Sequence, residues 1–263
     1  MKKFKILTSL VFIAIIAAIL LTSCGEDSAP TNTNTGSGWH PNLNFSVGQQ
    51  FVYTNDSLHS NGTTHNFTRR RTNSTIAAQV TYQGQVCYMV TGTTFDSTNN
   101  QSTPELPYYI RYEQNSGIYF QYGIRQLINP GLPGSWDTVG NFNVSRGSTY
   151  FISNINYSVP LPQPYGNVNF TGPLNGRIAD STSIQQWSNN ASIPCYRIEL
   201  TASISGNSQL GTITANIIID YYLGYGSPTG IVEVKLRPFN FVVAGQVNVP
   251  QPGYDRKLYS HNP

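Results

Sequence analysis

The chain has 263 residues, of which only 10% are charged, with 15 Lys and Arg against 12 Asp and Glu. Three of the basic residues lie among the first five positions, which leaves 12 Lys and Arg against 12 Asp and Glu from residue 24 onward. A neutral chain of this kind excludes nucleic-acid binding, and its 12% aromatic content with many Thr, Asn and Ser residues favours strands and turns over helices.

Residues 1–23 are typical of an export signal, because basic residues precede an apolar run that begins at Ile6. The run closes on Leu21-Thr22-Ser23-Cys24, which resembles the lipobox of bacterial lipoproteins and implies that Cys24 becomes the lipidated first residue. A transmembrane helix is the alternative, but the 18 residues from Ile6 to Ser23 are at the lower limit for crossing a bilayer. We therefore expect an outer-membrane lipoprotein, held through its N-terminal lipid on the periplasmic or the cell-surface face.

Residues 24–38 are expected to form a flexible tether, because they hold no large apolar side chain after the cysteine. Glu26 and Asp27 resemble the acidic sorting signals that carry some lipoproteins to the cell surface. They are equally well explained as the charges of a solvated linker.

Residues 39–263 read as an all-β domain of antiparallel strands, because short alternating runs are separated by turn residues. The Asn61-Gly62 pair predicts a two-residue hairpin with strands near 50–60 and 63–72, in which His65 faces Leu58. Further strands are expected in the runs 86–90, 108–112, 118–122, 150–155, 195–204, 211–223, 231–236 and 239–247.

Three landmarks recur in the same order and predict an internal duplication, with repeats at about 39–128 and 140–247. Tyr108-Tyr109 to Gly117-Ile118 matches Tyr221-Tyr222 to Gly230-Ile231 at an offset of 113, and Cys87-Tyr88 matches Cys195-Tyr196 at 108. Gly48-x-x-Phe51 matches Gly147-x-x-Tyr150 at an offset of 99. Chance matches in a chain rich in Tyr and Gly are the alternative. Residues 130–137 are the expected junction.

The opening at Pro41, Gly48, Phe51 and Tyr53 resembles that of poorly characterised bacterial lipoproteins, although these usually have Trp in place of Phe51. Residues 221–226 and 229–234 resemble a strand-turn-strand of the same group that also occurs in half-barrels similar to LolA and LolB. The resemblance implies an antiparallel meander forming a curved half-barrel or a clam-like pair of sheets. It carries over no functional residue.

Two cysteines remain after Cys24. Because an exported chain permits disulfides, Cys87 and Cys195 could form one bond. Two inert buried thiols are the alternative.

Few residues suggest a site. Arg69 and Arg71 would share a strand face and could clamp an anion, or Arg69-Arg70-Arg71 could protect an edge strand. His59 and His65 fall on opposite faces of the hairpin, and metal-binding motifs are missing from the sequence, so we expect neither a metal nor a cofactor. Trp136 could contact a ligand, because it follows a Pro/Gly loop rather than sitting within a strand, and packing over the core is the alternative.

The sequence gives no basis for catalysis. It contains no Gly-x-Ser-x-Gly elbow, and Glu199 is expected to pair with Arg197 on its own strand, whereas Asp220 could be buried. The expected role is non-catalytic binding of a lipid-like or small hydrophobic ligand in a concave apolar surface. The alternative is a structural or adhesive surface module that binds protein or glycan, and a hydrolase ranks third.

Overall fold

The computed structural model describes residues 40–59, 65–128, 131–160, 167–186, 188–209, 211–225 and 229–262. The predicted signal, Cys24, the tether and the Asn61-Gly62 turn lie outside these ranges. The described chain consists of fourteen strands and one short 3-10 helix, and every strand pairing is antiparallel, so the all-β prediction is confirmed. Among these residues, no helix has the length and apolar character needed to cross a membrane.

The first half of the chain holds six strands and the 3-10 helix η1 (Ile124–Leu127), which lies between β5 and β6. These strands are β1 (Gln50–Leu58), β2 (His65–Tyr82), β3 (Gln85–Asp96), β4 (Gln101–Glu113), β5 (Ile118–Tyr122) and β6 (Trp136–Asn141). The predicted 50–60 and 63–72 hairpin is present as β1 and β2, and His65 pairs with Leu58 as expected. Trp136 is the first residue of β6, so the expectation that it lies outside a strand was wrong.

The second half supplies the remaining strands: β7 (Thr149–Pro160), β8 (Asn167–Gln185), β9 (Ser192–Ser208), β10 (Gly211–Tyr225), β11 (Thr229–Leu236), β12 (Phe239–Val243), β13 (Val247–Gln251) and β14 (Gly253–Asn262). The predicted run 239–247 is divided by a turn. Ala244 and Gly245 both have positive φ there, at 51° and 69°, and this geometry allows β12 and β13 to form a tight hairpin.

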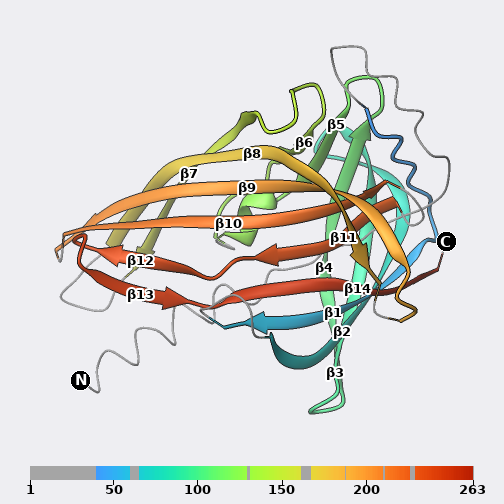
Figure 1. Cartoon of the computed structure of the whole chain (residues 1–263), viewed down its shortest axis with the longest axis horizontal. Helices are drawn as coiled ribbons and strands as arrows, with labels where there is room; N and C mark the ends of the chain where they lie inside the picture. Colours follow the sequence, from blue (N-terminus) through green and yellow to red (C-terminus); the bar gives the residue numbers. More distant parts are fainter. Residues whose placement is uncertain are drawn as a thin grey trace.

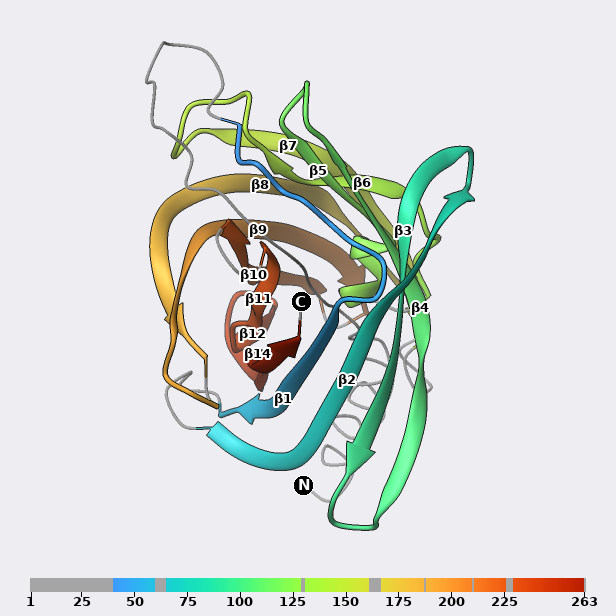
Figure 2. The same ribbon diagram turned by 90° about the vertical axis from the view of Figure 1, so that its right-hand side faces the viewer.

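One continuous sheet contains all fourteen strands (Figure 1). Its order is β6-β5-β4-β3-β2-β1-β14-β11-β10-β9-β8-β7, with β12 paired to β10 and β13 to β12. Figure 2 shows the sheet curling around its long axis, so that β6 contacts β7, β8 and β9. The Tyr150 hydroxyl of β7 donates a hydrogen bond to the Val139 carbonyl of β6. This single curved sheet confirms the half-barrel and not a clam of two separate sheets.

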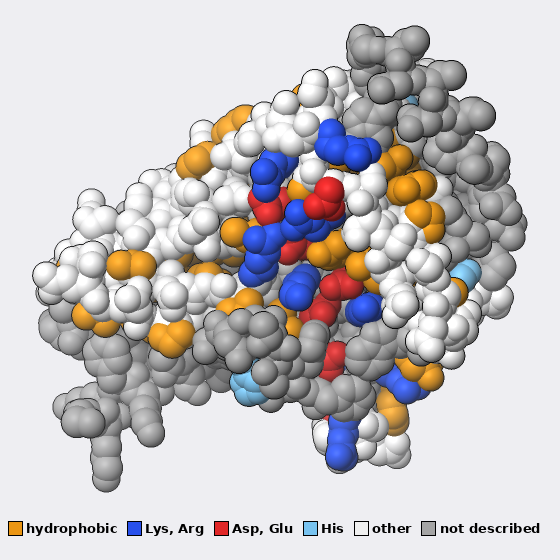
Figure 3. Space-filling view, in the orientation of Figure 1, with side chains coloured by type: hydrophobic (Ala, Val, Ile, Leu, Met, Phe, Trp, Pro, Cys, Tyr) orange, Lys and Arg blue, Asp and Glu red, His pale blue; other side chains and the backbone are white. Residues whose placement is uncertain are grey.

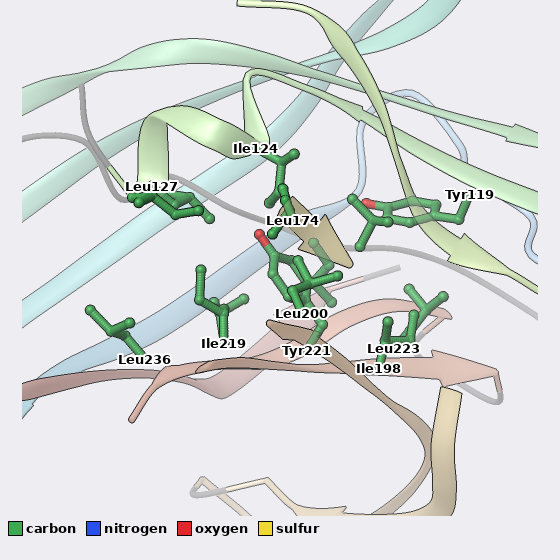
Figure 4. Close-up of a cluster of buried hydrophobic side chains, with 14 of the residues drawn as sticks. Tyr119, Ile124, Leu127, Leu174, Ile198, Leu200, Ile219, Tyr221, Leu223 and Leu236 are labelled. Carbon is green, nitrogen blue, oxygen red and sulfur yellow. The ribbon is translucent and has the colours of Figure 1, made fainter. Parts of the chain in front are cut away.

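Alternation along the strands separates a buried inner face from a polar outer one. In β10, for example, Ile213, Ile217 and Tyr221 are buried, whereas Thr212 and Thr214 are exposed. Figure 4 shows Tyr119 of β5 with Ile124 and Leu127 of η1 on one side of the core, facing inner residues of β8 to β11. The inner face is thus covered by the chain itself.

The strands β1–β5 and β7–β11 repeat the same pairing pattern. Gly48 donates its backbone N–H to Ile76 at 2.9 Å, and Gly147 donates to Ile178 at 2.8 Å. A bulge follows each isoleucine, between Ile76 and Ala78 and between Ile178 and Asp180.

The register of the next strand pair also repeats. Tyr88 of β3 pairs with Ile110 of β4, and Tyr196 of β9 pairs with Leu223 of β10, which preserves the sequence offsets of 108 and 113. These shared pairings support the duplication predicted from the landmarks. The repeat boundaries stay a prediction.

Candidate binding face

The concave face that was expected to hold a ligand is packed with the protein's own side chains. Tyr53 has none of its surface exposed, and Tyr119 and Tyr221 have 1% each. A side chain that lines a lipid-sized cavity keeps accessible surface, so these residues belong to a packed core.

The segment before β1 helps to cover this face. Leu43 and Phe45 are buried, and the Phe45 ring lies edge-on to Tyr88 at 5.6 Å between centroids. The Tyr112 hydroxyl donates to the Pro41 carbonyl at 2.6 Å, and the His40 ring lies 2.9 Å from the Asn143 side-chain oxygen. This segment therefore fills a position that a ligand would need.

A buried ion pair occupies the polar end of the inner face. Arg256 of β14, 1% exposed, donates to both oxygens of Glu105 at 2.9 and 3.1 Å. Thr72 and Thr94 also donate to Glu105, at 3.2 and 2.5 Å. Gly92 allows this approach, because a Cβ there would lie 3.0 Å from the carboxylate. The carboxylate is occupied by protein donors, which gives the group a structural role.

The outer face of the first half carries four aromatic rings that do not belong to the core cluster, and we name Tyr82, Tyr109, Tyr122 and Trp136 the aromatic patch. Tyr82 and Tyr109 stack with centroids 3.7 Å apart and an interplanar angle of 8°. Tyr122 lies edge-on to Tyr82 at 4.9 Å, and Trp136 lies edge-on to Tyr122 at 5.6 Å. All four are partly exposed. The rings come from β2, β4, β5 and β6 and form one continuous surface.

Hydrogen bonds and a close loop hold the patch in place. The Trp136 indole N–H donates to the Tyr82 carbonyl at 3.4 Å, which links β6 to the end of β2. Gly134 lies against Tyr122, since a Cβ on it would come within 2.5 Å of the ring. A larger residue than glycine at position 134 would displace the ring or the loop, so the loop before β6 fixes the ring position.

A buried carboxylate anchors the same loop. Asp137, 4% exposed, accepts from Arg125 Nε at 3.2 Å and from the Ser135 hydroxyl at 2.9 Å. Burial raises the pKa of Asp137, and the bonds from Ser135 and Arg125 partly offset this rise. Both charges are engaged with each other, so they add no net charge beside the patch.

Arg111, Glu113 and Gln85 form a row of polar side chains beside the aromatic patch. Arg111 lies over the Phe120 ring at 4.6 Å and makes an ion pair with Glu113 and a hydrogen bond to the Gln85 side-chain oxygen. Burial is the main cause that raises the pKa values of Tyr109 and Tyr122, and nearby Tyr82 adds to the rise. The phenols therefore stay neutral at physiological pH. The face combines neutral hydroxyls, aromatic surface and an internally paired row of charges.

The second half carries charges on its outer face instead. Arg177, Glu199, Arg237, Asp220, Arg197 and Asp180 form a chain of alternating sign, which we name the ionic chain, with N–O distances of 2.6, 2.7, 2.6, 3.5 and 2.7 Å between successive partners. Figure 3 shows Lys, Arg, Asp and Glu side chains gathered in the middle of the face that it presents.

The expected partner of Glu199 was wrong. Glu199 makes ion pairs with Arg177 of β8 and with Arg237, which follows β11. Arg197 instead pairs with Asp180 and Asp220. Burial opposes ionisation of Glu199, but hydrogen bonds from Arg177 and Arg237 outweigh it and lower the pKa of this carboxyl. Asp220 is buried, as anticipated. These charges satisfy one another and present no catalytic pair.

Arg69 and Arg71, which were predicted to bind an anion together, have different environments. Arg69 has a φ of +55° at an irregularity in the β1–β2 pairing, which interrupts the alternation on which the clamp depended. Arg71 lies over the Tyr259 ring at 4.2 Å, and Arg70 pairs with Asp96 at 2.9 Å. The structure thus does not bring Arg69 and Arg71 together as a pair.

The Cys87–Cys195 disulfide is not formed. Both thiols are free and buried, on β3 and β9, and five strands of the sheet lie between them. Each thiol donates to a nearby carbonyl, Cys87 to Val80 at 3.5 Å and Cys195 to Ile193 at 3.3 Å. Burial raises both pKa values, that of Cys195 to about 12, so the two residues are unreactive.

His40, His59 and His261 have different surroundings. His261 lies 3.0 Å from the Gln186 side-chain oxygen, and His59 is exposed beyond the end of β1. Within the described part of the chain, no group of His, Cys, Asp and Glu could hold a metal ion.

Sequence reasoning identified one member of the aromatic patch, Trp136, and missed the three tyrosines. Tyr109 lies between buried Tyr108 and Ile110, so strand alternation already placed it on the outer face. Tyr82 and Tyr122 are the last residues of their strands. Their convergence depends on the order of β2 to β6 in the sheet, which no local pattern encodes.

Comparisons with known proteins assign no family. No family model and no curated protein matches the chain. Two solved structures are similar. A candidate lipoprotein from Parabacteroides distasonis has 12% sequence identity and a TM-score of 0.46, and the match covers 86% of this chain and 99% of that one. A candidate exported protein with a YmcC-like fold from Bacteroides fragilis has 9% identity and a TM-score of 0.45, and the match covers 86% of this chain and 100% of that one. Likeness at this level assigns no function. The resemblance to LolA and LolB stays a prediction.

Proposed function

We propose that this protein is a non-catalytic adhesive module of the bacterial envelope that binds a partner protein through the aromatic patch. The observation that supports this function is a continuous, partly exposed surface of Tyr82, Tyr109, Tyr122 and Trp136 outside the core. Protein interfaces are enriched in Tyr, Trp and Arg, and a few such residues carry most of their binding energy.

The ring arrangement favours a protein over a glycan. Tyr82 and Tyr109 press their faces together, and Trp136 and Tyr122 meet edge to face, so much of the ring surface that a sugar would cover is already used. The neighbouring charges Arg111 and Arg125 are paired with Glu113 and Asp137. A partner segment with apolar, uncharged side chains fits this surface.

Site-specific photo-crosslinking tests the proposal. A photoreactive phenylalanine at position 136 of the full chain, irradiated in living cells, is expected to yield a discrete protein adduct. The matched control places the same residue at Val247, which is 50% exposed on β13 of the other half. Lack of an adduct at position 136, or the same adduct at both positions, would contradict a protein partner.

The N-terminal sequence supports a second part of the proposal, namely anchoring to the outer membrane by a lipid on Cys24. Removal of residues 1–23 and acylation would appear in the mass of the purified protein. Cys24→Ser is expected to release the protein from the membrane fraction. A protein that keeps residues 1–23 would contradict this anchor.

Lipid carriage has less support than adhesion. The inner residues Tyr53, Tyr119 and Tyr221 are closed to solvent, and Phe45 packs on the same face. A native mass spectrum showing a stoichiometric lipid on the purified chain would reverse this order.

A further inference from the structure

One end of the domain carries no charge. The segments 149–176, 200–219 and 238–254 contain no Lys, Arg, Asp or Glu. They comprise β7, β12 and β13, with the adjoining parts of β8, β9 and β10. The left end of the molecule in Figure 3 accordingly shows neither basic nor acidic side chains among the coloured residues.

The outer face of this end is an array of short polar side chains. Asn156 of β7 pairs with Thr171 of β8, Thr171 with Ser205 of β9, and Ser205 with Thr214 of β10. All four are exposed. The array ends at β7, where the sheet itself ends.

β7 is an open edge of the sheet. It pairs with β8 along its whole length, and among the described strands no other lies beside it in the sheet. The opposite edge strand, β6, differs because it packs against β8 and β9. The contact with β6 reaches the start of β7, where Tyr150 bonds to Val139, and among the described residues no strand pairs with the rest of β7 on the side away from β8.

Natural proteins protect such edges with charged side chains, proline, bulges or covering elements. β7 has no charged residue, its register irregularity lies near its start, between Phe151 and Ser153, and its proline is the final residue, Pro160. The stretch from Asn154 to Val159 is therefore an unprotected template for strand pairing.

We propose that this edge pairs antiparallel with the β7 strand of a second copy of the chain, which joins the two sheets about a twofold axis. A second copy is the occupant that fits, because self-pairing places Asn154, Asn156 and Ser158 opposite the same uncharged residues. No like charges meet in such a pairing. Half-buried Tyr157 and Val159 would also gain cover on the inner side.

Cysteine crosslinking tests the pairing in the full-length protein purified in detergent. Asn154→Cys, Asn156→Cys and Ser158→Cys are made separately, with Ser203→Cys on the exposed face of β9 as the matched control. Directly opposed residues of an antiparallel pair have Cα atoms about 4.5 to 5.5 Å apart, which suits a disulfide. Under mild oxidation we expect one of the three variants to form a covalent dimer at least about tenfold faster than the control.

A charge placed on the edge provides the second measurement. Asn156→Lys is expected to raise the dimer dissociation constant at least about tenfold in analytical ultracentrifugation, whereas Thr214→Lys, on β10 at the end of the array farthest from β7, leaves it unchanged. A monomer at all concentrations with no crosslink above the Ser203→Cys control would overturn the proposal. Equal effects of the two lysines would also overturn it.

Discussion

The two halves of the sheet share their strand pairing and differ in what they display. At equivalent places of the outer face, the first half has Ala78 and Met89 where the second has Asp180 and Arg197. At the sequence offset of 113, Phe120 of the first half corresponds to Glu233. The aromatic patch lies on the first half, whereas the ionic chain, which includes Asp180 and Arg197, lies on the second.

The inner positions explain why the pairing is shared. Ile76 and Ile178 are both wholly buried, and Tyr108 and Tyr221 are buried at matching sites. A shift by one residue would turn every such side chain outward, so the inner face fixes the register. The outer face is then free to vary, and comparison of the halves separates residues that build the fold from those available for function.

The largest difference is expected between two ion pairs. Arg256→Met should cost about 3–5 kcal/mol in the free energy of unfolding, because it leaves Glu105 buried without its cation. Arg177→Met, at the exposed end of the ionic chain, should cost about 1 kcal/mol, because Glu199 keeps its second partner Arg237. Urea unfolding measures both. Glu105→Leu combined with Arg256→Met should recover part of the loss, and equal costs for the two single variants would refute the distinction.

The equivalent isoleucines should respond alike. Ile76→Ala and Ile178→Ala each remove a fully buried side chain beside a bulge, and we expect each to cost about 3 kcal/mol. Thermal or urea unfolding tests whether the two values agree within about 1 kcal/mol. A large difference between the two costs would mean that the halves have the same strand pairing but different packing around the two isoleucines.

Glu233 should give the second half its own pH dependence. Burial first, and then Asp255, raise the pKa of Glu233 from its ordinary value of about 4.5 to about 8, while Lys257 and Lys235 lower it. The folded state therefore binds an extra proton, and the stability it confers is complete below about pH 4.5 and is lost as the pH rises to about 8.

Glu233→Gln should remove this dependence and stabilise the protein by about 4 kcal/mol at pH 8, because the pKa is raised from 4.5 to about 8 and each pKa unit is worth about 1.4 kcal/mol. The difference from the unchanged protein should shrink towards pH 5. Urea unfolding at several pH values measures it. A constant difference across this range would show that Glu233 is ionised throughout.

The smallest effect is expected at the two turn glycines. Gly48 and Gly147 have φ values of +99° and +85°, and nothing lies within 4 Å of a Cβ built on either. Gly48→Ala and Gly147→Ala should each cost about 1 kcal/mol, from backbone strain alone. Calorimetry can compare them with Gly206→Ala. At Gly206 a Cβ would lie 2.7 Å from the Asn169 carbonyl oxygen, so Gly206→Ala should cost more than either turn variant. A smaller cost at Gly206 would argue against strain alone at the two turns.

Local patterns predicted much of the fold. Alternating apolar runs located the strands whose inner residues are Ile and Tyr, and Asn61-Gly62 set the β1–β2 register. No strand was predicted for β6, β8 or β14. In β14 the reason is that Asp255-Arg256-Lys257 reads as a solvated segment. Arg256 is buried only because Glu105, distant in the sequence, meets it across the sheet.

The candidate site was less accessible to prediction. Trp136 was selected from its loop, but its neighbours Tyr82, Tyr109 and Tyr122 come from three other strands. Sequence spacing does not report which strands adjoin. The same reason explains why Glu199 was paired with Arg197, next to it on one strand face, and not with arginines from neighbouring segments.

β14 joins the two halves by pairing with β1 on one side and β11 on the other, although it follows every other strand in the chain. Until residues 253–262 are available, no strand joins β1 to β11 in the sheet, and among the described residues the halves meet through packing such as that of β6 on β7, β8 and β9. A polypeptide threaded through a translocation pore from its amino terminus would therefore complete this sheet only when its last strand emerged. Completion of the sheet by its last strand would keep the chain from folding fully during transport.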